Sequence, residues 1–396
     1  MGLIQDMEKN VRDRIRSNLS EQTDETVLEL IEELVLHDEA ISHISIREKT
    51  AMIDTIFYKT RKDLSILEPY ARDSSVSEIM VNGKDSVFIE QNGRINKMDK
   101  SFDSTEELEE VIRRIGAKIH REINELNPIM DARLDDGSRV NAVYKNIALN
   151  GPILTIRKFP KTRITMADLI DYGTITEEAS GFLQKLVKGA YNIFISGGTS
   201  SGKTTFLNIL SNYIPENERI ITIEDSAELQ VTAVDNIVRL ECKNANIQGK
   251  GEVNMQNLIR SSLRMRPNRI IVGEVRGAEV LDMIQAMNTG HDGSLSTGHG
   301  NSPKGMLNRL EAMFLQAADF PVEAIRSQIY EAIDIIVHLG MIPGRKRVVL
   351  EIAELTGIHD SEIQLNILYA YDRKNGLTKK KELINTKKLE MRGISI

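Results

Sequence analysis

The stretch FISGGTSSGKTTFLNIL, residues 194–210, decides how the second half of the chain folds. Four of its residues match the pattern G-x-x-x-x-G-K-[ST], namely Gly197, Gly202, Lys203 and Thr204. An apolar run precedes the match and a helix-period run follows it. In such a loop, backbone N–H groups surround a phosphate and the lysine reaches the β- and γ-phosphate oxygens. The stretch therefore predicts a nucleotide-binding loop between a strand and a helix.

The predicted loop supplies both phosphate contacts and a metal ligand. The residues that we expect to contact the nucleotide are Gly197, Gly198, Thr199, Ser200, Ser201, Gly202, Lys203, Thr204 and Thr205. Thr204 would also coordinate Mg²⁺, because the hydroxyl that follows the lysine is the metal ligand of this motif. The loop does not say which acid completes the site.

Two apolar runs end in acidic residues: RIITIED contains Glu224, and RIIVGEV contains Glu274. The carboxyl ends of parallel strands lie on one edge of a sheet, so both carboxylates would face the nucleotide. We expect Glu274 to order Mg²⁺ through a water molecule and Glu224 to polarise the attacking water. Their spacing alone does not assign the two roles.

Two further clusters each have two interpretations. The glycine-rich stretch from 288 to 305 carries His291 and His299, and we expect His299 to sense the γ-phosphate. A metal site is disfavoured because the histidines are eight residues apart with no cysteine between them. The arginines between 260 and 276 either form surface salt bridges or include one that reaches phosphate.

The spacing of apolar residues and the turn signals along the sequence predict an α/β protein with several parts. Apolar stripes at helical spacing, including Val27 and Ile31, indicate a helical N-terminal segment. Asn-Gly pairs between short apolar runs, followed by a helix with Ser104 and Glu107 in capping-box positions, indicate a small α/β domain. Apolar runs alternating with helices then indicate a parallel sheet covered on both faces. The predicted parts are residues 1–70, 71–160, a linker at 161–175, a nucleotide-binding domain at 176–372, and a basic, loosely packed tail at 373–396.

Composition limits the compartment and the partners. The 396 residues include 51 Lys and Arg against 58 Asp and Glu, a net charge of −7, which disfavours direct nucleic-acid binding. No run approaches the length of a membrane-spanning helix, and the single cysteine, Cys242, supports no disulfide framework. We therefore expect a cytoplasmic protein whose membrane contact is peripheral.

Four segments in fixed order resemble motifs of the secretion ATPases of the type II/type IV superfamily. GGTSSGKTT, TIEDSAEL, LRMRPNRIIVGEVRG and STGHGNSPKGMLNRLE look like their Walker A, Asp box, atypical Walker B and His box. VSEIMVNGKDSVFIEQNGRI, DARLDDGSRVNAVY and GPILTIRKF resemble their amino-terminal domain. The resemblance covers about residues 70 to 355 and is strongest to the CpaF-like ATPases of tight-adherence (Flp/Tad) pilus assembly.

The resemblance implies a RecA-like P-loop fold and a hexameric motor. Hydrolysis of ATP would power pilus assembly or protein secretion from the cytoplasmic face of the inner membrane, on a membrane platform protein. Within the motifs, Glu274, Glu224 and His299 match family positions. Arg133, Arg139 and Arg157 match basic positions of the amino-terminal domain that approach nucleotide. The acidic charge makes the DNA-transfer branch less favoured.

Two other function classes compete with the motor. A nucleotide-switch assembly module would bind ATP with negligible turnover, but it would not need two acids. A P-loop kinase would need an acceptor pocket, and it leaves the His box without a role. Phosphate release with water as the only acceptor distinguishes these classes.

Overall fold

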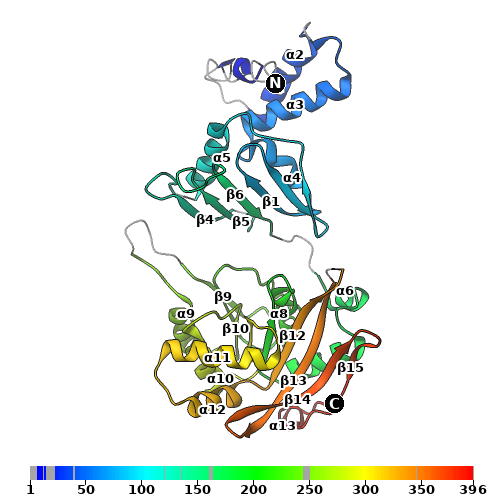
Figure 1. Ribbon diagram of the computed structural model, residues 1–396, viewed down its shortest axis with the longest axis vertical. Coiled ribbons are helices and arrows are strands. Elements are labelled where there is room, and N and C mark those ends of the chain that lie inside the picture. The colour runs from blue at the N-terminus through cyan, green and yellow to red at the C-terminus, as the bar shows by residue number, and fades with distance from the viewer. Residues whose placement is uncertain are drawn as a thin grey trace. The chain divides into compact units, whose positions relative to one another are not determined.

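The computed structural model describes residues 7–11, 13–14, 23–38, 41–119, 121–134, 136–159, 164–243, 250–344 and 346–395. The chain forms two compact units, Met1–Arg163 and Ile164–Ile396, whose elements are labelled in Figure 1. Parts of the predicted N-terminal segment and residues 161–163 of the predicted linker lie outside the described residues. No helix within these ranges is long and apolar enough to cross a membrane.

The first unit begins with helices, as the apolar stripe predicts. Helix α2 spans Asp24–Leu36, α3 spans Ile46–Arg61, and the short α4 spans Glu68–Arg72. Ser45 begins α3 with a complete capping box, since its hydroxyl accepts from the Glu48 N–H and the Glu48 carboxylate accepts in return. The two longer helices share a separate small core of buried residues: Met7, Val11, Val27, Ile31, Val35, Ile41, Ile53 and Ile56.

An antiparallel six-stranded sheet completes the first unit, in the order β3-β2-β1-β6-β5-β4. The strands are β1 Val76–Asn82, β2 Val87–Gln91, β3 Arg94–Lys97, β4 Ile129–Arg133, β5 Arg139–Val143 and β6 Ile153–Arg157. Asn92 and Gly93, with φ angles of 52° and 74°, make the predicted tight turn between β2 and β3. The apolar face of α5, Thr105–Lys118, packs in the same core as the sheet.

The start of α5 agrees with the sequence, although one expected bond differs. The Ser104 hydroxyl accepts the Glu107 N–H at 3.1 Å. The Glu107 carboxylate bonds the backbone N–H of Asp103 at 2.8 Å instead of that of Ser104, and it also accepts from the Ser65 hydroxyl. The helix cap therefore also connects α5 to the helical segment before the sheet.

The second unit contains a nine-stranded sheet in the order β15-β14-β13-β12-β7-β11-β10-β8-β9. The six strands from β12 to β9 run parallel to one another, and β13, β14 and β15 extend the sheet from β12 by antiparallel pairing. The bounds are β7 Ile193–Gly197, β8 Ile220–Glu224, β9 Ile237–Glu241, β10 Arg269–Val272, β11 Leu295–His299, β12 Ile335–Ile342, β13 Lys346–His359, β14 Glu362–Asp372 and β15 Gly376–Lys379. The antiparallel extension was not predicted.

Helices cover both faces of this sheet, as predicted for a buried parallel sheet. Side chains of β7 alternate between the two cores: Ile193 and Ile195 pack with α7 (Glu177–Lys188) and α8 (Lys203–Ser211), whereas Phe194 packs on the opposite face. The opposite face is covered by α9 Met255–Ser262, α10 Glu279–Asn288, α11 Pro303–Ala317 and α12 Val322–Ala332, seen together in Figure 1.

Part of the segment expected as a linker belongs to the second unit. Residues Met166–Asp171 form helix α6, which begins with a capping box between Thr165 and Asp168. Met166 and Leu169 are buried in the same core as β7. The short α6 thus places residues 164–174 beside the phosphate-binding loop.

The prediction of a loosely packed tail was wrong. Leu377, Leu383 and Leu389 are buried in the core of the second unit, and the tail includes β15 and the short α13, Lys387–Met391. The Glu354 carboxylate accepts the backbone N–H groups of Ile384 and Asn385 at 2.9 and 2.7 Å. This packing was not predicted, because three leucines among many lysines give no recognisable apolar periodicity.

We expect Leu389→Ala to lower the free energy of unfolding by about 2–4 kcal/mol, because it leaves a cavity where a fully buried side chain was. Ile384→Ala, in the same tail but with a 68% exposed side chain, is the control and should change it by less than about 0.5 kcal/mol. Urea denaturation measures both. Equal midpoints for the two variants would show that the tail does not contribute to the core.

Candidate nucleotide site

The phosphate-binding loop connects the end of β7 at Gly197 to the start of α8 at Lys203. Ser200 and Gly202 have left-handed φ angles of 59° and 94°. Alternation of left-handed and ordinary residues turns successive backbone N–H groups to one side, which makes an anion-binding concavity. The N-terminus of α8 adds positive potential at the same place.

Gly197 has no room for a side chain. A Cβ atom at this position would lie 2.5 Å from the Ser201 hydroxyl oxygen and 2.6 Å from the Leu339 carbonyl oxygen. At Gly198, the next residue, a Cβ atom would meet nothing within 4 Å. The loop therefore requires glycine at its first position for packing reasons, whereas the second position is sterically open.

Lys203 is buried at the start of α8, with its ammonium group near the mouth of the loop. Its Nζ donates to the Gly198 carbonyl at 2.9 Å and lies 3.3 Å from Nδ1 of His299. Burial lowers the pKa of Lys203 below its usual value, and the negative charge of Glu274 opposes that shift. The ammonium group is thus held by neutral partners, which a phosphate oxygen could replace.

His299 connects the lysine to the acid that the sequence singled out. It ends β11, the neighbour of β7, and its Nε2 lies 2.7 Å from Oε1 of Glu274. Burial is the main cause of the lowered pKa of His299, and the positive charge of Lys203 adds to it. Nδ1 faces the ammonium group and Nε2 faces Glu274, so a neutral ring that accepts from Lys203 has its proton on the side of Glu274.

Glu274 follows β10 by two residues and lies at the same sheet edge. Its second carboxylate oxygen accepts from Nη2 of Arg276 at 2.7 Å. Arg276 also pairs with Asp225 at 3.4 Å. The carboxyl ends of β7, β11 and β10 thereby bring together the sequence-predicted Lys203, His299 and Glu274.

Glu224 lies at the end of β8, but its carboxylate is directed into the following loop. One oxygen accepts the backbone N–H groups of Glu228 and Leu229 at 2.8 and 3.0 Å. Burial raises the pKa of Glu224 to about 7, although these two hydrogen bonds oppose the shift. In this conformation Glu224 organises the loop after β8.

The remaining arginines and His291 separate into structural and site residues. Arg269 is fully buried and bonds Glu218, and Arg260 pairs with Asp282 on α10. His291 lies 3.1 Å from the Ala286 carbonyl through Nδ1. Within the described ranges, no three His, Cys, Asp or Glu side chains gather as a metal site. Of this arginine cluster, Arg276 is the member that contacts Glu274.

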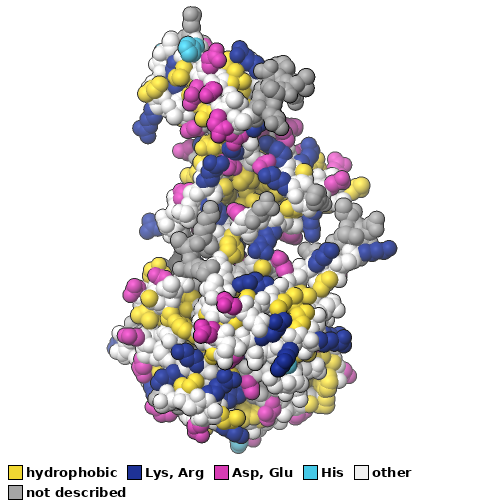
Figure 2. Space-filling model, turned by 180° about the vertical axis from the view of Figure 1, so that it is seen from behind, with side chains coloured by type: hydrophobic (Ala, Val, Ile, Leu, Met, Phe, Trp, Pro, Cys, Tyr) yellow, Lys and Arg dark blue, Asp and Glu magenta, His cyan; other side chains and the backbone are white. Residues whose placement is uncertain are grey.

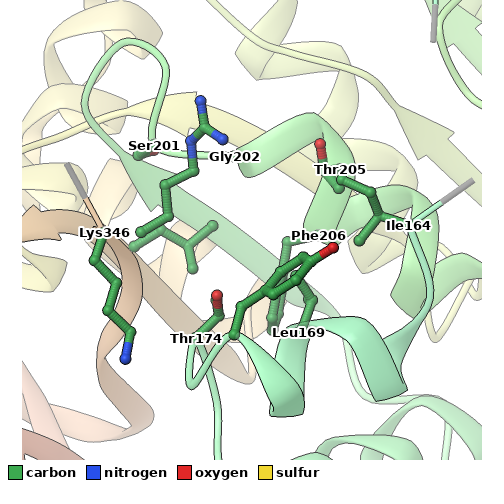
Figure 3. A pocket seen from close by; sticks show the side chains of 11 residues that line it. Ile164, Leu169, Thr174, Ser201, Gly202, Thr205, Phe206 and Lys346 are labelled. Atoms are coloured by element: carbon green, nitrogen blue, oxygen red, sulfur yellow. The ribbon is translucent and has the colours of Figure 1, made fainter. Parts of the chain in front are cut away.

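A pocket of about 200 Å³ lies beside the loop, and Figure 3 shows the side chains around it. Its apolar lining includes Ile164, Leu169 and Phe206, while Thr174, Thr205, Lys346 and Arg347 supply polar groups. The pocket residues from 164–174 and 346–347 were not predicted, because neither segment carries a motif. Topology brings them to the loop.

The three arginines expected to approach nucleotide form a row in the first unit. Arg133 on β4 is paired with Arg139 on β5, which is paired with Arg157 on β6. Residues directly opposite each other project from the same face of a sheet, and like charges so placed are destabilising unless a negative group lies nearby. Glu78 of β1 stands opposite Arg157 in the same row and supplies a negative charge beside it.

We expect Gly197→Ala to weaken ADP binding at least about tenfold, because its Cβ atom displaces Ser201 or β12 and distorts the loop. Gly198→Ala is the matched control, with open space for its methyl group, and should keep the affinity within about threefold. Titration with a fluorescent ADP analogue measures both. If both variants lose the same ADP affinity, or if neither loses any, the result would contradict the loop geometry.

The solved structures that this chain resembles share its fold. The crystal structure titled as the pilus retraction motor PilT with bound ADP aligns with a TM-score of 0.53 and 20% identity, over 76% of this chain and 82% of that one. The ATPase DotB of Yersinia pseudotuberculosis aligns with a TM-score of 0.56 and 19% identity, over 74% and 79%.

Curated relatives are more similar in sequence. An uncharacterised protein of Methanocaldococcus jannaschii is 41% identical over 65% of this chain and 37% of its own length, so the chain spans well under half of that relative. The conjugal transfer protein TrbB of Rhizobium radiobacter is 32% identical, over 74% of this chain and 87% of TrbB. The type IV secretion system protein PtlH of Bordetella pertussis is 31% identical, over 72% and 92%.

The model of the type II/IV secretion system protein family matches residues 60–344, which include both sheets' central strands and every motif described above. The chain belongs to the type II/IV secretion system protein family.

Proposed function

We propose that this protein is an ATP-hydrolysing motor of a secretion or pilus-assembly machine. The observation that carries the proposal is the contact series Lys203–His299–Glu274 at the mouth of the phosphate-binding loop. A cation for the γ-phosphate and a carboxylate that can position water lie on either side of an imidazole, an arrangement that suits in-line attack of water on ATP. The reaction yields ADP and phosphate.

At the phosphate end, each side chain has a distinct task. Lys203 exchanges the Gly198 carbonyl and His299 for phosphate oxygens. The Ser201 hydroxyl is buried and has no hydrogen-bond partner among the described residues, and we propose that it bonds a phosphate oxygen. His299 would sense the γ-phosphate once Lys203 moves to it, and Glu274 would orient the attacking water.

The oxygen donors at this edge suit Mg²⁺, which prefers hard oxygen ligands and keeps several waters. Thr204 would hold the ion through its hydroxyl and Glu274 through a water molecule. Because no cluster of ligating side chains was found within the described ranges, most of its ligands would be phosphate and water oxygens. When bound, Mg²⁺ neutralises charge that develops on the phosphates.

The pocket beside the loop would take the rest of the nucleotide. Its apolar side chains suit the faces of a base, and Thr174 offers a hydroxyl. The arginine row of the first unit would contribute positive charge to a nucleotide bound in the assembled protein. Glu224 remains a proposed second catalytic acid, which would have to leave the N–H groups of Glu228 and Leu229 to reach water.

We further propose a homo-hexamer acting at the cytoplasmic face of the membrane on a platform protein. The family match, together with TrbB and PtlH being named as transfer and secretion proteins, supports work within a secretion machine. The Flp/Tad pilus assignment rests on the motif resemblance. The face seen in Figure 2 carries acidic and basic side chains interspersed, which supports a protein partner more than nucleic acid.

Phosphate release from Mg-ATP, with no acceptor but water, tests the activity. We expect Lys203→Ala to lower turnover at least about 100-fold, because it removes the cation that meets the γ-phosphate. The wild type and this variant are compared at saturating ATP. Turnover that Lys203→Ala leaves unchanged would reject the site. Tight ATP binding without turnover in the wild type would favour the nucleotide-switch module.

Two single-atom changes separate the roles of the acids. We expect Glu274→Gln to keep ATP affinity within about threefold while lowering kcat at least about 100-fold, because the amide cannot accept a proton from water. Glu224→Gln should lower kcat less than about tenfold if its carboxylate stays in the loop. Steady-state kinetics of both variants shows which carboxylate contributes more to kcat. A larger loss in Glu224→Gln would make Glu224 the principal catalytic acid.

A further inference from the structure

The phosphate-binding loop receives a hydrogen bond from a residue outside all four motifs. Arg347, the second residue of β13, donates its Nε–H to the carbonyl oxygen of Ser200 at 2.9 Å. Its side chain also approaches Gly202, where a Cβ atom would lie 3.5 Å from Cδ of the arginine. Ser200 and Gly202 are the two left-handed residues of the loop. Arg347 therefore contacts the loop at both positions that set its shape.

The conformation of Ser200 is unfavourable by itself. A non-glycine residue with a φ angle of 59° costs roughly 1–2 kcal/mol and persists where the surroundings hold it. Position 200 carries serine and not glycine, so the loop bears this conformational cost. The bond from Arg347 acts on the same peptide, so it stabilises the left-handed form against alternatives that would move the carbonyl.

Two other loop carbonyls are bonded from within the nucleotide-binding core. Gly197 accepts from the Gly300 N–H at 3.3 Å, and Gly198 accepts from Lys203 Nζ and from the Ser201 N–H. The Ser200 carbonyl differs, because its donor comes from the antiparallel extension of the sheet. In such a loop the N–H groups, and not the carbonyls, face the anion, so a donor that fixes a carbonyl also fixes the direction of the next N–H.

We propose that Arg347 is a positioning residue that holds the phosphate-binding loop in its anion-binding form, acting through the left-handed peptide of Ser200. The inference rests on the proposed nucleotide site and adds a residue to it. It also gives the antiparallel strand β13 a role in nucleotide affinity, although none of the motif residues lies on that strand.

The test is ADP affinity in the full chain, which needs no turnover. Arg347→Ala should weaken ADP binding about tenfold, consistent with the loss of one hydrogen bond from a charged donor. Arg347→Lys, which keeps the charge but not the Nε–H, should weaken it nearly as much. An Arg347→Lys variant with wild-type affinity would show that only charge matters and would overturn the proposal.

A second substitution reports on the mechanism. Ser200→Gly removes the conformational cost at that position, so adding it to Arg347→Ala should restore affinity to within about threefold of the wild type. A double variant as weak as Arg347→Ala would overturn the role of the Ser200 peptide. This rescue would not occur if the arginine only stabilised the fold.

Arg326→Ala is the matched control. Arg326 also donates to the carbonyl of a left-handed serine, Ser361 with a φ angle of 60°, but at the turn between β13 and β14. The Arg326→Ala variant should keep ADP affinity within about twofold of the wild type. If it loses as much affinity as Arg347→Ala, the effect of Arg347→Ala would be due to general stability. The ADP affinity of Lys203→Ala, measured in the same series, distinguishes a failure of this inference from a failure of the proposed nucleotide site. If Lys203→Ala weakens binding and Arg347→Ala does not, only this inference fails; if neither does, the proposed nucleotide site fails as well.

Discussion

The parallel register of β7, β11 and β10 is the constraint on which the site depends. It brings the ends of three strands to one edge, so that Lys203, His299 and Glu274 meet although they are separated by up to 96 residues along the chain. The parallel pairing of β7 with β12 on its other side leaves little freedom at the first loop residue, where Leu339 of β12 closes the space around Gly197. Shape and chemistry of the site therefore share one cause.

The partners of Lys203 explain how the site can respond to nucleotide. A buried ammonium group needs hydrogen-bond partners, and here they are a backbone carbonyl and a neutral imidazole. A phosphate would offer stronger, charged acceptors. Its arrival would release Nδ1 of His299, whose other nitrogen faces Glu274. Binding of phosphate in the loop would thus affect the Glu274 carboxylate through a single side chain, His299.

Local patterns predicted much of the fold, because they depend on neighbours in the chain. The glycine motif, the Asn92-Gly93 turn and the cap at Ser104 all appear where expected. Both acidic strand ends were found, since parallel strands share an edge. The direction of the Glu224 carboxylate was not predictable, because it depends on N–H groups four and five residues further on that form only in the folded loop.

Features that depend on long-range packing could not be predicted from the sequence. Strand β13 alternates only weakly in burial, so its apolar residues gave no clear period, and Arg347 carried no signal that it meets Ser200 from 147 residues away. The buried leucines of the tail were hidden among lysines. In each case a contact across the sheet, rather than a local pattern, fixes the residue's environment.

A crystal structure of the full chain with Mg²⁺, ADP and beryllium fluoride tests the central claim most directly. We expect Nζ of Lys203 to leave the Gly198 carbonyl and His299 and to contact the fluoride group, and Glu274 to lie within hydrogen-bond reach of the water in line with it. A phosphate mimic bound away from the loop, or Lys203 still bonded to Gly198 and His299 beside a bound nucleotide, would contradict it.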